Sequence, residues 1–571
     1  MNKNLKIEEI NYNSEELNQV VSNWEISEDS KYLLRYPTVY IINDKNKKNN
    51  FDVYVGETNN IKNRTKQHLN KSDSDWLNLS NSETSSMYVI GHSYFNKSLT
   101  LDIENRLMQY LSSVESVNKL HNNRTNQQNE YYTSDKLEEI FSEVWGELHK
   151  KDNKLFPIES IVRDSAIFKA SPFHKLTDEQ ITAKEVIMEK IEFALQREEK
   201  GQLIMVEGEA GSGKTVLMST LFYELKKVGY EDDLESLNVH LLVNHDEHVM
   251  IYRQIASKLG LSDKPKKVIN KPTSFILDHK PKEKVDIVIV DEAHLLLTQG
   301  KMSYKGKGHL KDLLERAKVV VTVFDRKQIL SREQIWEYDT LDKLVEDVQQ
   351  NNNLIQLKNQ LRINSSIETI NWIRGFIDNQ IVDPIPYDNK GYDIKIFDTP
   401  ASLERAIRKK ADSTESGISR VIATFDWKFN GNKSPEEDKY WKVQIGDWSM
   451  PWNKQIKVKK GESQLPWIER SNTIDEVGST FTIQGIDLNY AGVIIGPSVK
   501  YRNGKITFDK DSSENSKAIQ NRTLSDNTKQ NFAEMLLQNE LNVLMTRGIN
   551  GLYIYAVDDE LRSALKEASK G

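Results

Sequence analysis

Apolar and polar positions follow two different patterns along the chain. Between residues 31 and 150, short β-branched and aromatic runs are mixed with amphipathic stretches of helical period. This mixture predicts a small α+β domain. Its strands are expected at 38–42 and 51–55, and its helices at 61–69, 99–111 and 137–149.

From residue 176 onward, helical stretches alternate with short and almost entirely apolar runs. Runs that are apolar on both faces predict the buried strands of parallel sheets that helices cover. The sequence therefore predicts an α/β fold, and its length fits two such sheets. The runs lie at 239–243, 287–290, 319–324, 421–424, 492–495 and 552–555.

Charge and composition change at the expected domain boundaries. Residues 1–30 carry two lysines against seven carboxylates, whereas residues 31–70 carry eight Lys or Arg against three carboxylates. We therefore expect an acidic N-terminal arm at 1–30 ahead of a basic domain at 31–150. The other expected parts are a linker at 151–175, a first lobe at 176–345, and a second lobe at 346–571 with a Trp-rich insert at 425–467 and a mobile polar insert at 500–530.

Composition restricts the chemistry. The 571 residues include no cysteine, which excludes disulfides, thiolate zinc sites and cysteine nucleophiles. No apolar run approaches about 18 residues, and residues 1–10 are polar and acidic, so we expect a cytoplasmic protein with neither a membrane span nor a signal peptide. The net charge of −7 restricts any nucleic-acid surface to local patches. Nothing in the sequence identifies a protein partner.

The clearest candidate for chemistry is the stretch GEAGSGKT, which begins at Gly208. An apolar run precedes it and a helical pattern follows it. In this order, backbone N–H groups around Gly211 and Gly213 can surround phosphates at a helix N-terminus. Lys214 can reach the outer phosphates, and the Thr215 hydroxyl can bind Mg²⁺. The pattern predicts a nucleoside triphosphate site.

Two carboxylates, Asp291 and Glu292, follow the apolar run at 287–290. Acidic residues at the carboxyl end of a buried parallel strand lie beside the phosphate loop in doubly wound folds. We expect Asp291 to hold Mg²⁺ and Glu292 to polarise the attacking water. The chain is therefore predicted to bind and hydrolyse ATP.

Further motifs occur in order between residues 176 and 560, and together they resemble the core of a superfamily 1 helicase. Within that superfamily, the chain is most similar to the Schlafen-like bacterial ATPase group. The resemblance implies two RecA-like lobes. It assigns adenine recognition to Gln180, γ-phosphate contacts to Gln328 and Arg362, coupling to nucleic acid to Gln484 and Gly485, and an arginine finger to Arg547.

Two features leave parts of this resemblance open. Phe324 and Arg326 depart from the commoner form of the third motif, which puts strand separation in doubt. Thr177 and Gln180 also suit an ordinary helix N-terminus, at which Thr177 would be the cap.

A second set of residues lies in the predicted hairpin and the helices after it. VYI at 39–41 and YVG at 54–56 fall on the two strands, and Arg64 and Glu104 fall on helices. They are similar to the GIY-YIG nuclease family over 38–132, although Val39 stands where that family has its first glycine. The resemblance implies a catalytic arginine at Arg64 and a metal-binding glutamate at Glu104. It also implies a late asparagine, for which the candidates are Asn118, Asn122 and Asn123.

These residue types can together cleave a phosphodiester bond. Tyr40 or Tyr54 can position or deprotonate a water molecule. Arg64 can bind a phosphate through two N–H donors, and Glu104 can hold one Mg²⁺ or Mn²⁺ ion. His68 lies one helical turn after Arg64 on the same face. The alternative for the tyrosines alone is ordinary strand aromatics.

Lysines and tryptophans mark candidate surfaces for nucleic acid. Bases can stack on aromatic rings, at about 1–3 kcal/mol per base, while lysines follow the backbone. The alternatives are solvated lysine faces and, for the tryptophans, a β-rich insert with a small core of its own. The candidates are seven lysines within 264–284, then Lys301, Lys305, Lys307 and Lys311, and the cluster Trp427, Trp441, Trp448, Trp452 and Trp467.

The leading hypothesis is an ATPase motor that depends on nucleic acid and is fused to a metal-dependent endonuclease. DNA is favoured over RNA as the substrate. Bacterial fusions of this design suggest defence against phage or foreign nucleic acid, an inference from architecture alone. One alternative is an ATP-gated sensor that switches the nuclease without translocating. Another is an ATPase whose N-terminal domain only binds nucleic acid.

Overall fold

The computed structural model divides the chain into two compact units. The first comprises Met1–Leu176 and Ile251–Lys267, and the second comprises Thr177–Met250 and Val268–Gly571. The residues described are 4–26, 30–46, 50–69, 79, 82, 84–121, 130–197, 201–231, 237–262, 264–301, 304–337, 339–413, 417–436 and 438–570.

The first unit contains a five-stranded sheet of order β1-β4-β2-β3-β5, flanked by helices. Only β3 and β5 pair in parallel. The strands are β1 (Leu5–Asn11), β2 (Thr38–Lys45), β3 (Phe51–Thr58), β4 (Ser85–His92) and β5 (Val117–Leu120). The helices are α1 (Ser14–Ile26), α2 (Lys31–Leu34), α3 (Ile61–Leu69), α5 (Lys97–Ser113), η2 (Ser134–Lys136), α6 (Leu137–Lys151), α7 (Glu159–Asp164) and α8 (Ala166–Lys169).

The predicted hairpin is the centre of this sheet. β2 and β3 pair antiparallel, with Tyr40 opposite Gly56, and β4 covers the other edge of β2. Met87 and Val89 of β4 pack with Tyr40 in one apolar cluster. The small α+β domain predicted from the sequence is therefore confirmed, and its hairpin positions the aromatic residues of the motif.

Two expected boundaries differ from the structure. Residues 1–30 do not form a separate acidic arm, because β1 pairs with β4 along its whole length and Trp24 of α1 is buried in the same core as Tyr40. The expected linker at 151–175 also folds within this unit. Its Glu159 accepts a hydrogen bond from the Tyr110 hydroxyl at 2.9 Å, and Phe168 packs on the Tyr110 ring. Net charge did not reveal the apolar residues that hold both segments in place.

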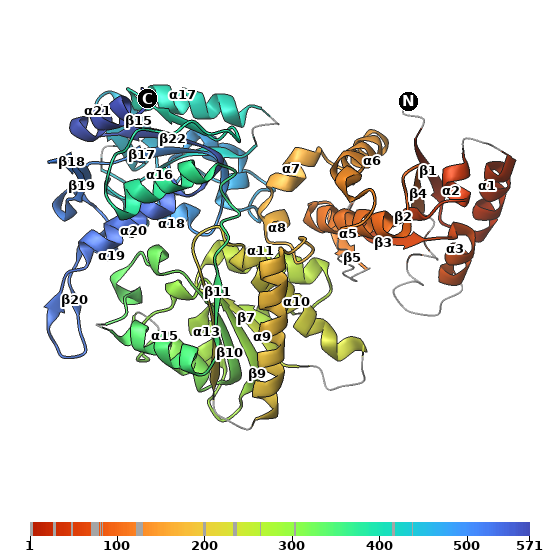
Figure 1. Cartoon of the computed structure of the whole chain (residues 1–571), viewed down its shortest axis with the longest axis horizontal. Helices are drawn as coiled ribbons and strands as arrows, with labels where there is room; N and C mark the ends of the chain where they lie inside the picture. The colour runs from red at the N-terminus through yellow and green to blue at the C-terminus, as the bar shows by residue number, and fades with distance from the viewer. Residues whose placement is uncertain are drawn as a thin grey trace. The chain divides into compact units, whose positions relative to one another are not determined.

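The first lobe of the second unit is built on a six-stranded parallel sheet of order β11-β6-β10-β9-β7-β8. Its strands β7, β9 and β10 are buried on both faces along almost their whole length, as expected for a parallel sheet covered by helices. Figure 1 shows α9 and α10 beside one face and α15 beside the other. The strands are β6 (Gln202–Gly208), β7 (Val239–Val243), β8 (Ile269–Asn270), β9 (Val285–Asp291), β10 (Ala317–Phe324) and β11 (Leu354–Leu357).

The helices of this lobe lie mainly between its strands in sequence. α11 is divided between the two units after Met250. They are α9 (Asp178–Gln196), α10 (Lys214–Glu231), α11 (Asp246–Lys258), α12 (Pro265–Val268), α13 (Pro272–Asp278), η3 (Ala293–Leu295), α14 (His309–Leu314), η4 (Arg326–Gln328), η5 (Arg332–Gln334) and α15 (Thr340–Gln350).

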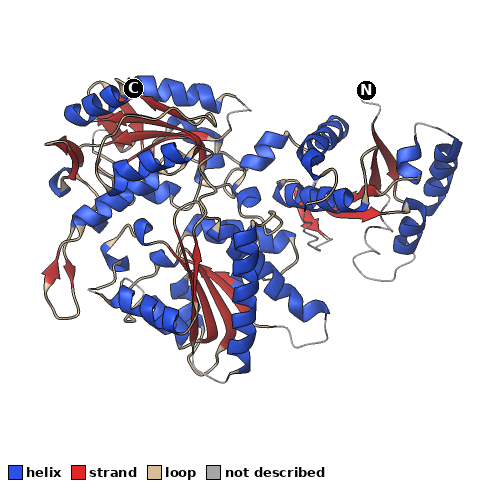
Figure 2. Cartoon of the chain, in the orientation of Figure 1, coloured by secondary structure: helices blue, strands red, loops and turns tan. Residues whose placement is uncertain are grey.

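The second lobe has a parallel sheet of order β12-β22-β17-β13-β16, which Figure 2 shows among its helices. The strands are β12 (Asp393–Ile396), β13 (Ser419–Ala423), β16 (Gly478–Ser479), β17 (Leu488–Ile495) and β22 (Gly548–Ala556). The helices are α16 (Ile367–Asp378), α17 (Pro400–Ala411), η6 (Trp467–Glu469), η7 (Ser471–Asp475), α18 (Thr480–Ile483), η8 (Lys510–Ser512), α19 (Ser516–Ile519), α20 (Ala533–Met545) and α21 (Asp559–Ala568). Three hairpins complete it: β14 (Lys442–Ile445) with β15 (Trp448–Pro451), β18 (Val499–Arg502) with β19 (Lys505–Phe508), and β20 (Arg522–Thr523) with β21 (Lys529–Gln530).

The expected insert at 500–530 is a structured part of the lobe. Its residues 516–530, here called the cross-lobe segment, also contact the first lobe. Arg522, whose side chain is 1% exposed, donates at 3.0 Å to the Arg332 carbonyl and pairs with Glu337 at 3.0 Å. The backbone N–H of Ser525 donates to the same Glu337 carboxylate at 2.9 Å. The polar composition of 500–530 suggested a mobile loop. That prediction was wrong because the residues that hold the segment, Arg332 and Glu337, are distant in sequence and cannot be inferred from composition.

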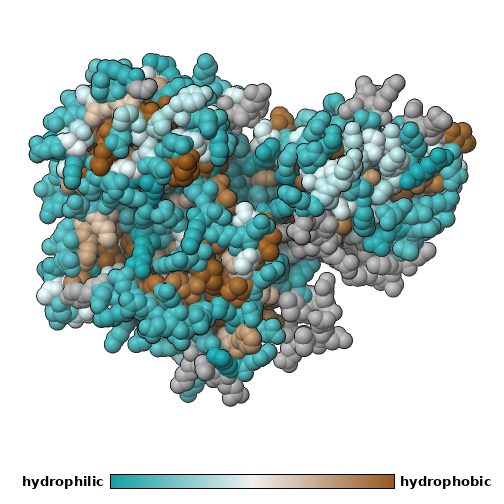
Figure 3. All heavy atoms as spheres, in the orientation of Figure 1, coloured by the Kyte–Doolittle hydropathy of each residue, from teal (hydrophilic) through white to brown (hydrophobic). Residues whose placement is uncertain are grey.

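Among the residues described, none forms a helix long and apolar enough to cross a membrane. The face drawn in Figure 3 is mostly hydrophilic, with apolar side chains in small separate patches.

Candidate functional site

Three aromatic rings form the centre of the first candidate site, in the first unit. The rings of Tyr40 and Tyr54 are stacked with centroids 6.0 Å apart, and the His68 ring meets Tyr54 edge-on at 5.5 Å. β2, β3 and α3 each contribute one ring. The fold therefore brings together three of the residues that the sequence predicted.

Gly56 is required by this packing. A Cβ atom on Gly56 would lie 2.5 Å from the Tyr40 hydroxyl oxygen and 2.9 Å from the Tyr54 ring. Real Cβ contacts are longer, so only glycine lets β3 pass under both rings. The last residue of the YVG stretch thus keeps the two tyrosines side by side.

Arg64 lies on the same helix as His68 and is partly buried beside the two hydroxyl groups. Burial, together with Tyr54, raises the pKa of Tyr40 well above its usual value, and the nearby Arg64 opposes this shift. Burial likewise raises the pKa of Tyr54, again against the effect of Arg64. Both phenols are therefore protonated at neutral pH, which favours hydrogen bonding to a water molecule over removal of its proton.

Glu104 is the carboxylate of the GIY-YIG-like motif. It lies on α5 with 6% of its surface exposed, and its negative charge acts on the hydroxyl of Tyr54. Among the residues described, no group of three or more His, Asp or Glu side chains can hold a metal ion. Metal binding by Glu104 therefore stays a prediction.

Of the three candidates for the late asparagine, the structure describes Asn118 alone, and it lies toward the opposite end of β3 from Gly56. Asn118 is exposed on β5 and donates at 2.9 Å to Asp52, which lies near the start of β3, whereas Gly56 lies near its end. The other two candidates, Asn122 and Asn123, lie outside the described residues.

The second candidate site begins at the phosphate loop between β6 and α10. Lys214 is buried, and its Nζ donates to the carbonyls of Gly208 and Glu209, each at 2.7 Å. Asp325, at the end of β10, lies 3.5 Å from the same ammonium group. Thr215 follows in the first turn of α10. A charged ammonium held over a helix N-terminus fits the binding of a triphosphate.

Asp291 and Glu292 lie at the carboxyl end of β9, as predicted. Both are buried, and Glu292 has a φ of +51°, a strained conformation for a residue with a side chain. Its carboxylate lies 3.2 Å from Nε2 of His294. Burial would raise the pKa of Glu292, but His294, His248, Lys214 and Arg547 lower it to about 2. The carboxylate is therefore ionised and can orient a water molecule.

Residues of the second lobe complete this site. Arg547 is fully buried, and its Nη2 donates at 3.0 Å to Oε1 of Gln328, whose Nε2 donates at 2.7 Å to Asp325. Asp487 lies 2.7 Å from Nε of Arg362 and 3.8 Å from Nη1 of Arg547. Burial, helped by Arg362, lowers the pKa of Arg547 to about 10, so it stays charged at neutral pH. One carboxylate thus holds both predicted arginines.

Two of the three predicted glutamines, Gln180 and Gln484, donate hydrogen bonds to backbone carbonyls. Gln180 forms a capping box with Thr177 and also donates at 3.3 Å to the Ser212 carbonyl in the phosphate loop. Gln180 therefore lies at a capped helix N-terminus, as the alternative predicted, and also beside the phosphate loop, as the motif predicted. Its recognition of adenine stays a prediction. Gln484 donates at 3.0 Å to the Gln328 carbonyl and so links the second lobe to the third motif.

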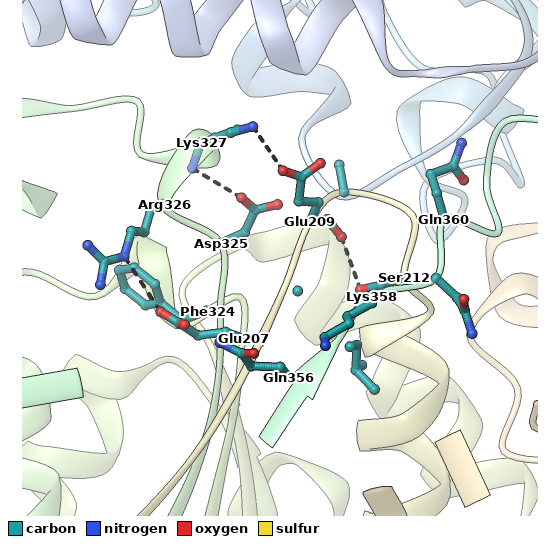
Figure 4. A pocket seen from close by; sticks show the side chains of 14 residues that line it. Glu207, Glu209, Ser212, Phe324, Asp325, Arg326, Lys327, Gln356, Lys358 and Gln360 are labelled. Atoms are coloured by element: carbon teal, nitrogen blue, oxygen red, sulfur yellow. Dashed lines mark hydrogen bonds and ion pairs between the residues drawn. The ribbon is translucent and has the colours of Figure 1, made fainter. Parts of the chain in front are cut away.

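A cavity of about 430 Å³ adjoins the phosphate loop (Figure 4). Phe324, Arg326 and Lys327 line it from the end of β10, and residues 356–360 line it from the end of β11. Lys214 and Thr215 are not among its lining residues. Lys327 crosses this region by pairing with Glu209 and with Asp378 of the second lobe, each at 2.9 Å. Gly208, Glu209, Ala210 and Ser212 also line the cavity, so it lies against the phosphate loop without including Lys214 or Thr215.

The tryptophan cluster has a structural role. Trp452 and Trp467 are fully buried, and the indole N–H of all five rings donates to a protein oxygen within 3.4 Å. The alternative of a small core in the insert therefore accounts for these rings. Two of the candidate lysines also pair with carboxylates, Lys301 with Glu333 and Lys454 with Glu247.

Sequence reasoning did not assign four residues of the nucleotide site: Asp325, Asp487, His248 and His294. Asp325 lies in the third helicase-like motif and Asp487 in the fifth, so their place in these motifs could have indicated that they belong to the nucleotide site. His248, near the start of α11, had no such signal. It reaches the site because Val243, at the end of β7, pairs with Asp291.

Comparison with known proteins agrees with this geometry. Residues 201–558 match the Schlafen group 3, DNA/RNA helicase domain, and residues 36–120 match the GIY-YIG catalytic domain. The first match covers more than half of the chain, so the protein belongs to the Schlafen group 3 helicase-domain family. It combines a helicase-like domain built from two parallel-sheet lobes with a GIY-YIG nuclease domain.

A relative shares a large part of this sequence. The chain is 33% identical over 398 residues to the Uncharacterized protein YPL245W of Saccharomyces cerevisiae. The similarity covers 64% of this chain and 84% of the yeast protein.

Proposed function

We propose that this protein is an ATPase dependent on nucleic acid whose nucleotide state controls a metal-dependent GIY-YIG endonuclease. The observation that carries the proposal is the convergence of Lys214, Asp291, Glu292 and the buried Arg547 at one site that needs both lobes. Tyr40, Tyr54, Arg64 and Glu104 form a separate centre on the same chain.

At the nucleotide site, Lys214 and the phosphate-loop amides would bind the triphosphate, and Thr215 and Asp291 would hold Mg²⁺, which neutralises charge on the phosphates. Glu292 would orient the attacking water. Arg547, positioned by Gln328 and Asp487, would stabilise charge that develops on the transferred phosphoryl group. Hydrolysis would then depend on contact between the lobes.

At the nuclease centre, the phenols of Tyr40 and Tyr54 would orient a water molecule toward the scissile phosphate, and Arg64 would bind its oxygens. A divalent ion on Glu104 would supply Lewis-acid stabilisation of the leaving oxygen. The raised pKa of both phenols supports a positioning role for them.

The alternative of an ATP-gated switch is favoured by the cross-lobe segment. Buried Arg522 joins the lobes through the Arg332 carbonyl and Glu337. Separating the lobes would break both of these contacts, and it would be costly wherever the guanidinium stayed buried without its partner. If Arg522 limits how far the lobes separate, the protein suits a conformational switch better than a motor whose lobes open and close at each step along a nucleic-acid strand. DNA as substrate and a role in defence against foreign nucleic acid are parts of the proposal that rest on architecture.

Cleavage and hydrolysis measured on the full-length protein test this proposal. Linear, circular and single-stranded DNA and RNA would be offered with Mg²⁺ or Mn²⁺, with ATP, ADP or no nucleotide. We expect cutting by the wild type, none by Glu104→Gln, and an altered rate in Glu292→Gln, which binds ATP but hydrolyses it slowly. Cutting that is independent of nucleotide and of Glu292→Gln would refute the coupling. If no substrate is cut while ATP is hydrolysed, the N-terminal domain only binds.

A further inference from the structure

His248 stands against the carboxylate that is proposed to orient the attacking water. It is 3% exposed on the first turn of α11, and its Nε2 has no hydrogen-bond partner among the described residues. A buried polar atom without a partner costs about 1–3 kcal/mol. Such a group is expected to have a use, and one ionised side chain on which His248 acts electrostatically is Glu292.

Gly485 of the second lobe closes over these two side chains. A Cβ atom on Gly485 would overlap the His248 imidazole and lie 3.1 Å from Oε1 of Glu292. Gly485 also has a φ of +76°, where side chains are disfavoured. The imidazole of His248 and the carboxylate of Glu292 are therefore both packed against Gly485 of the second lobe, where there is no room for a side chain.

Neighbouring residues hold α11 against the second lobe at the same place. Glu247 pairs with Lys454 at 2.5 Å, and Nε2 of His245 lies 3.4 Å from the Phe481 carbonyl in α18. His245 and Glu247, which precede His248 in the sequence, thus both contact the second lobe. A change in contact between the lobes would therefore alter the position of Gly485 relative to His248.

We propose that His248 is a positioning residue for ATP hydrolysis, which orients Glu292 or its water only when Gly485 of the second lobe is in place. The imidazole N–H would donate to the carboxylate, directly or through the water. The inference rests on the proposed ATPase function and adds the group that makes hydrolysis sensitive to lobe contact.

Steady-state ATPase kinetics on the full chain, with and without single-stranded DNA, test this role. We expect His248→Ala to lower kcat by about 10- to 100-fold. This is the range for residues that orient a functional group without touching the substrate themselves. The KM for ATP should change little, because the role proposed for His248 is to orient Glu292 or its water and not to bind phosphate. His248→Gln should recover part of the rate, since its amide can also donate. A histidine needed only for folding would give no such rescue.

The matched control is His240→Gln. His240 is also buried in the first lobe, but its Nε2 lies 3.0 Å from Asn238 and its ring packs on Phe275. This variant should keep the wild-type kcat. Equal losses in both histidine variants would overturn the proposal, as would a wild-type kcat in His248→Ala.

A double variant tests the shared space. Gly485→Ala alone should lower kcat because its methyl group displaces His248. Adding His248→Ala should cause little further loss, so the two effects should not add. Multiplied losses would show that the two residues act separately and would overturn the proposal. Absence of ATP hydrolysis in the wild type would instead refute the proposed function itself.

Discussion

The two candidate centres differ in how their residues are gathered. The nuclease centre comes from residues 40–104, on one hairpin and two helices of a single unit. The nucleotide site comes from residues 180–547, on two lobes whose buried contacts include Arg547 with Gln328. A centre built within one unit is complete when that unit folds. A site shared by two lobes works only when they meet, so it can respond to a ligand.

The largest expected effect separates the two chemistries. Lys214→Ala should abolish ATP hydrolysis, because the ammonium group that bridges the phosphate loop and Asp325 is lost, while a basal nuclease activity persists. Glu104→Ala should abolish cleavage while ATPase activity persists. Both rates would be measured on each full-length variant under one metal. Loss of ATP hydrolysis in Glu104→Ala, or loss of even the basal cleavage in Lys214→Ala, would contradict two chemically separate centres.

The next effect tests the contribution of the second lobe. Arg547→Ala should retain ATP binding but lower kcat by about a thousandfold, as expected for an arginine finger. Equilibrium binding of a fluorescent ATP analogue and steady-state turnover would be compared. The control is Arg405→Ala, an exposed arginine on α17 of the same lobe. Weak binding with normal turnover would assign Arg547 a different role.

A smaller effect concerns the cross-lobe segment. Arg522→Met should destabilise the second unit by about 3–5 kcal/mol, because removing one member of a buried ionic network leaves its partners unpaired. Denaturant unfolding would measure this. Arg502→Met is the control, since Arg502 pairs with Asp558 at 2.8 Å within one lobe.

The same variants can report lobe separation directly. The chain has no cysteine, so Gln350→Cys and Lys409→Cys would label the two lobes without background. Energy transfer between the labels should fall in Arg522→Met and stay unchanged in Arg502→Met. Unchanged transfer in both would show that the cross-lobe segment does not hold the lobes together.

The smallest effect is a pH dependence confined to the second unit. Glu540 on α20 is buried, and burial together with Asp426 raises its pKa to about 7. A raised folded-state pKa gives stability that is complete below the unfolded value of about 4.5 and is lost as pH rises through 7, by about 2–3 kcal/mol.

Glu540→Gln should therefore flatten the decline in unfolding free energy between pH 5 and pH 8. Unfolding would be followed as two transitions, with that of the nuclease unit as the internal reference. A wild-type slope in Glu540→Gln would mean that this carboxyl does not titrate in the window.

The elements that sequence patterns predicted best were those whose signal is local. α3 was expected at 61–69 and β7 at 239–243, and both have these bounds in the structure. The α/β fold and the family resemblance are confirmed. The short edge strand β12 was missed because it is only partly buried and so lacks a continuous apolar run.

Charge patterns predicted less. The acidic residues 1–30 suggested an arm, yet Ile10 and Trp24 anchor them to the nuclease sheet. The polar insert suggested a mobile loop, yet Arg522 is buried against the first lobe. A few apolar or ionic contacts outweigh average composition, since each is worth kilocalories when buried.

The sequence by itself determined the chemistry available to this protein. Spacing within one strand–loop–helix placed Lys214 and Thr215 together, and one hairpin with its helix placed Tyr40 and Arg64 together, because short segments have few ways to fold. Only the tertiary structure decided that Asp487 holds both arginines, that Gly485 covers His248, and that Arg522 joins the lobes. These contacts join residues far apart in the chain. Their partners are selected by how two sheets pack, which no local pattern encodes.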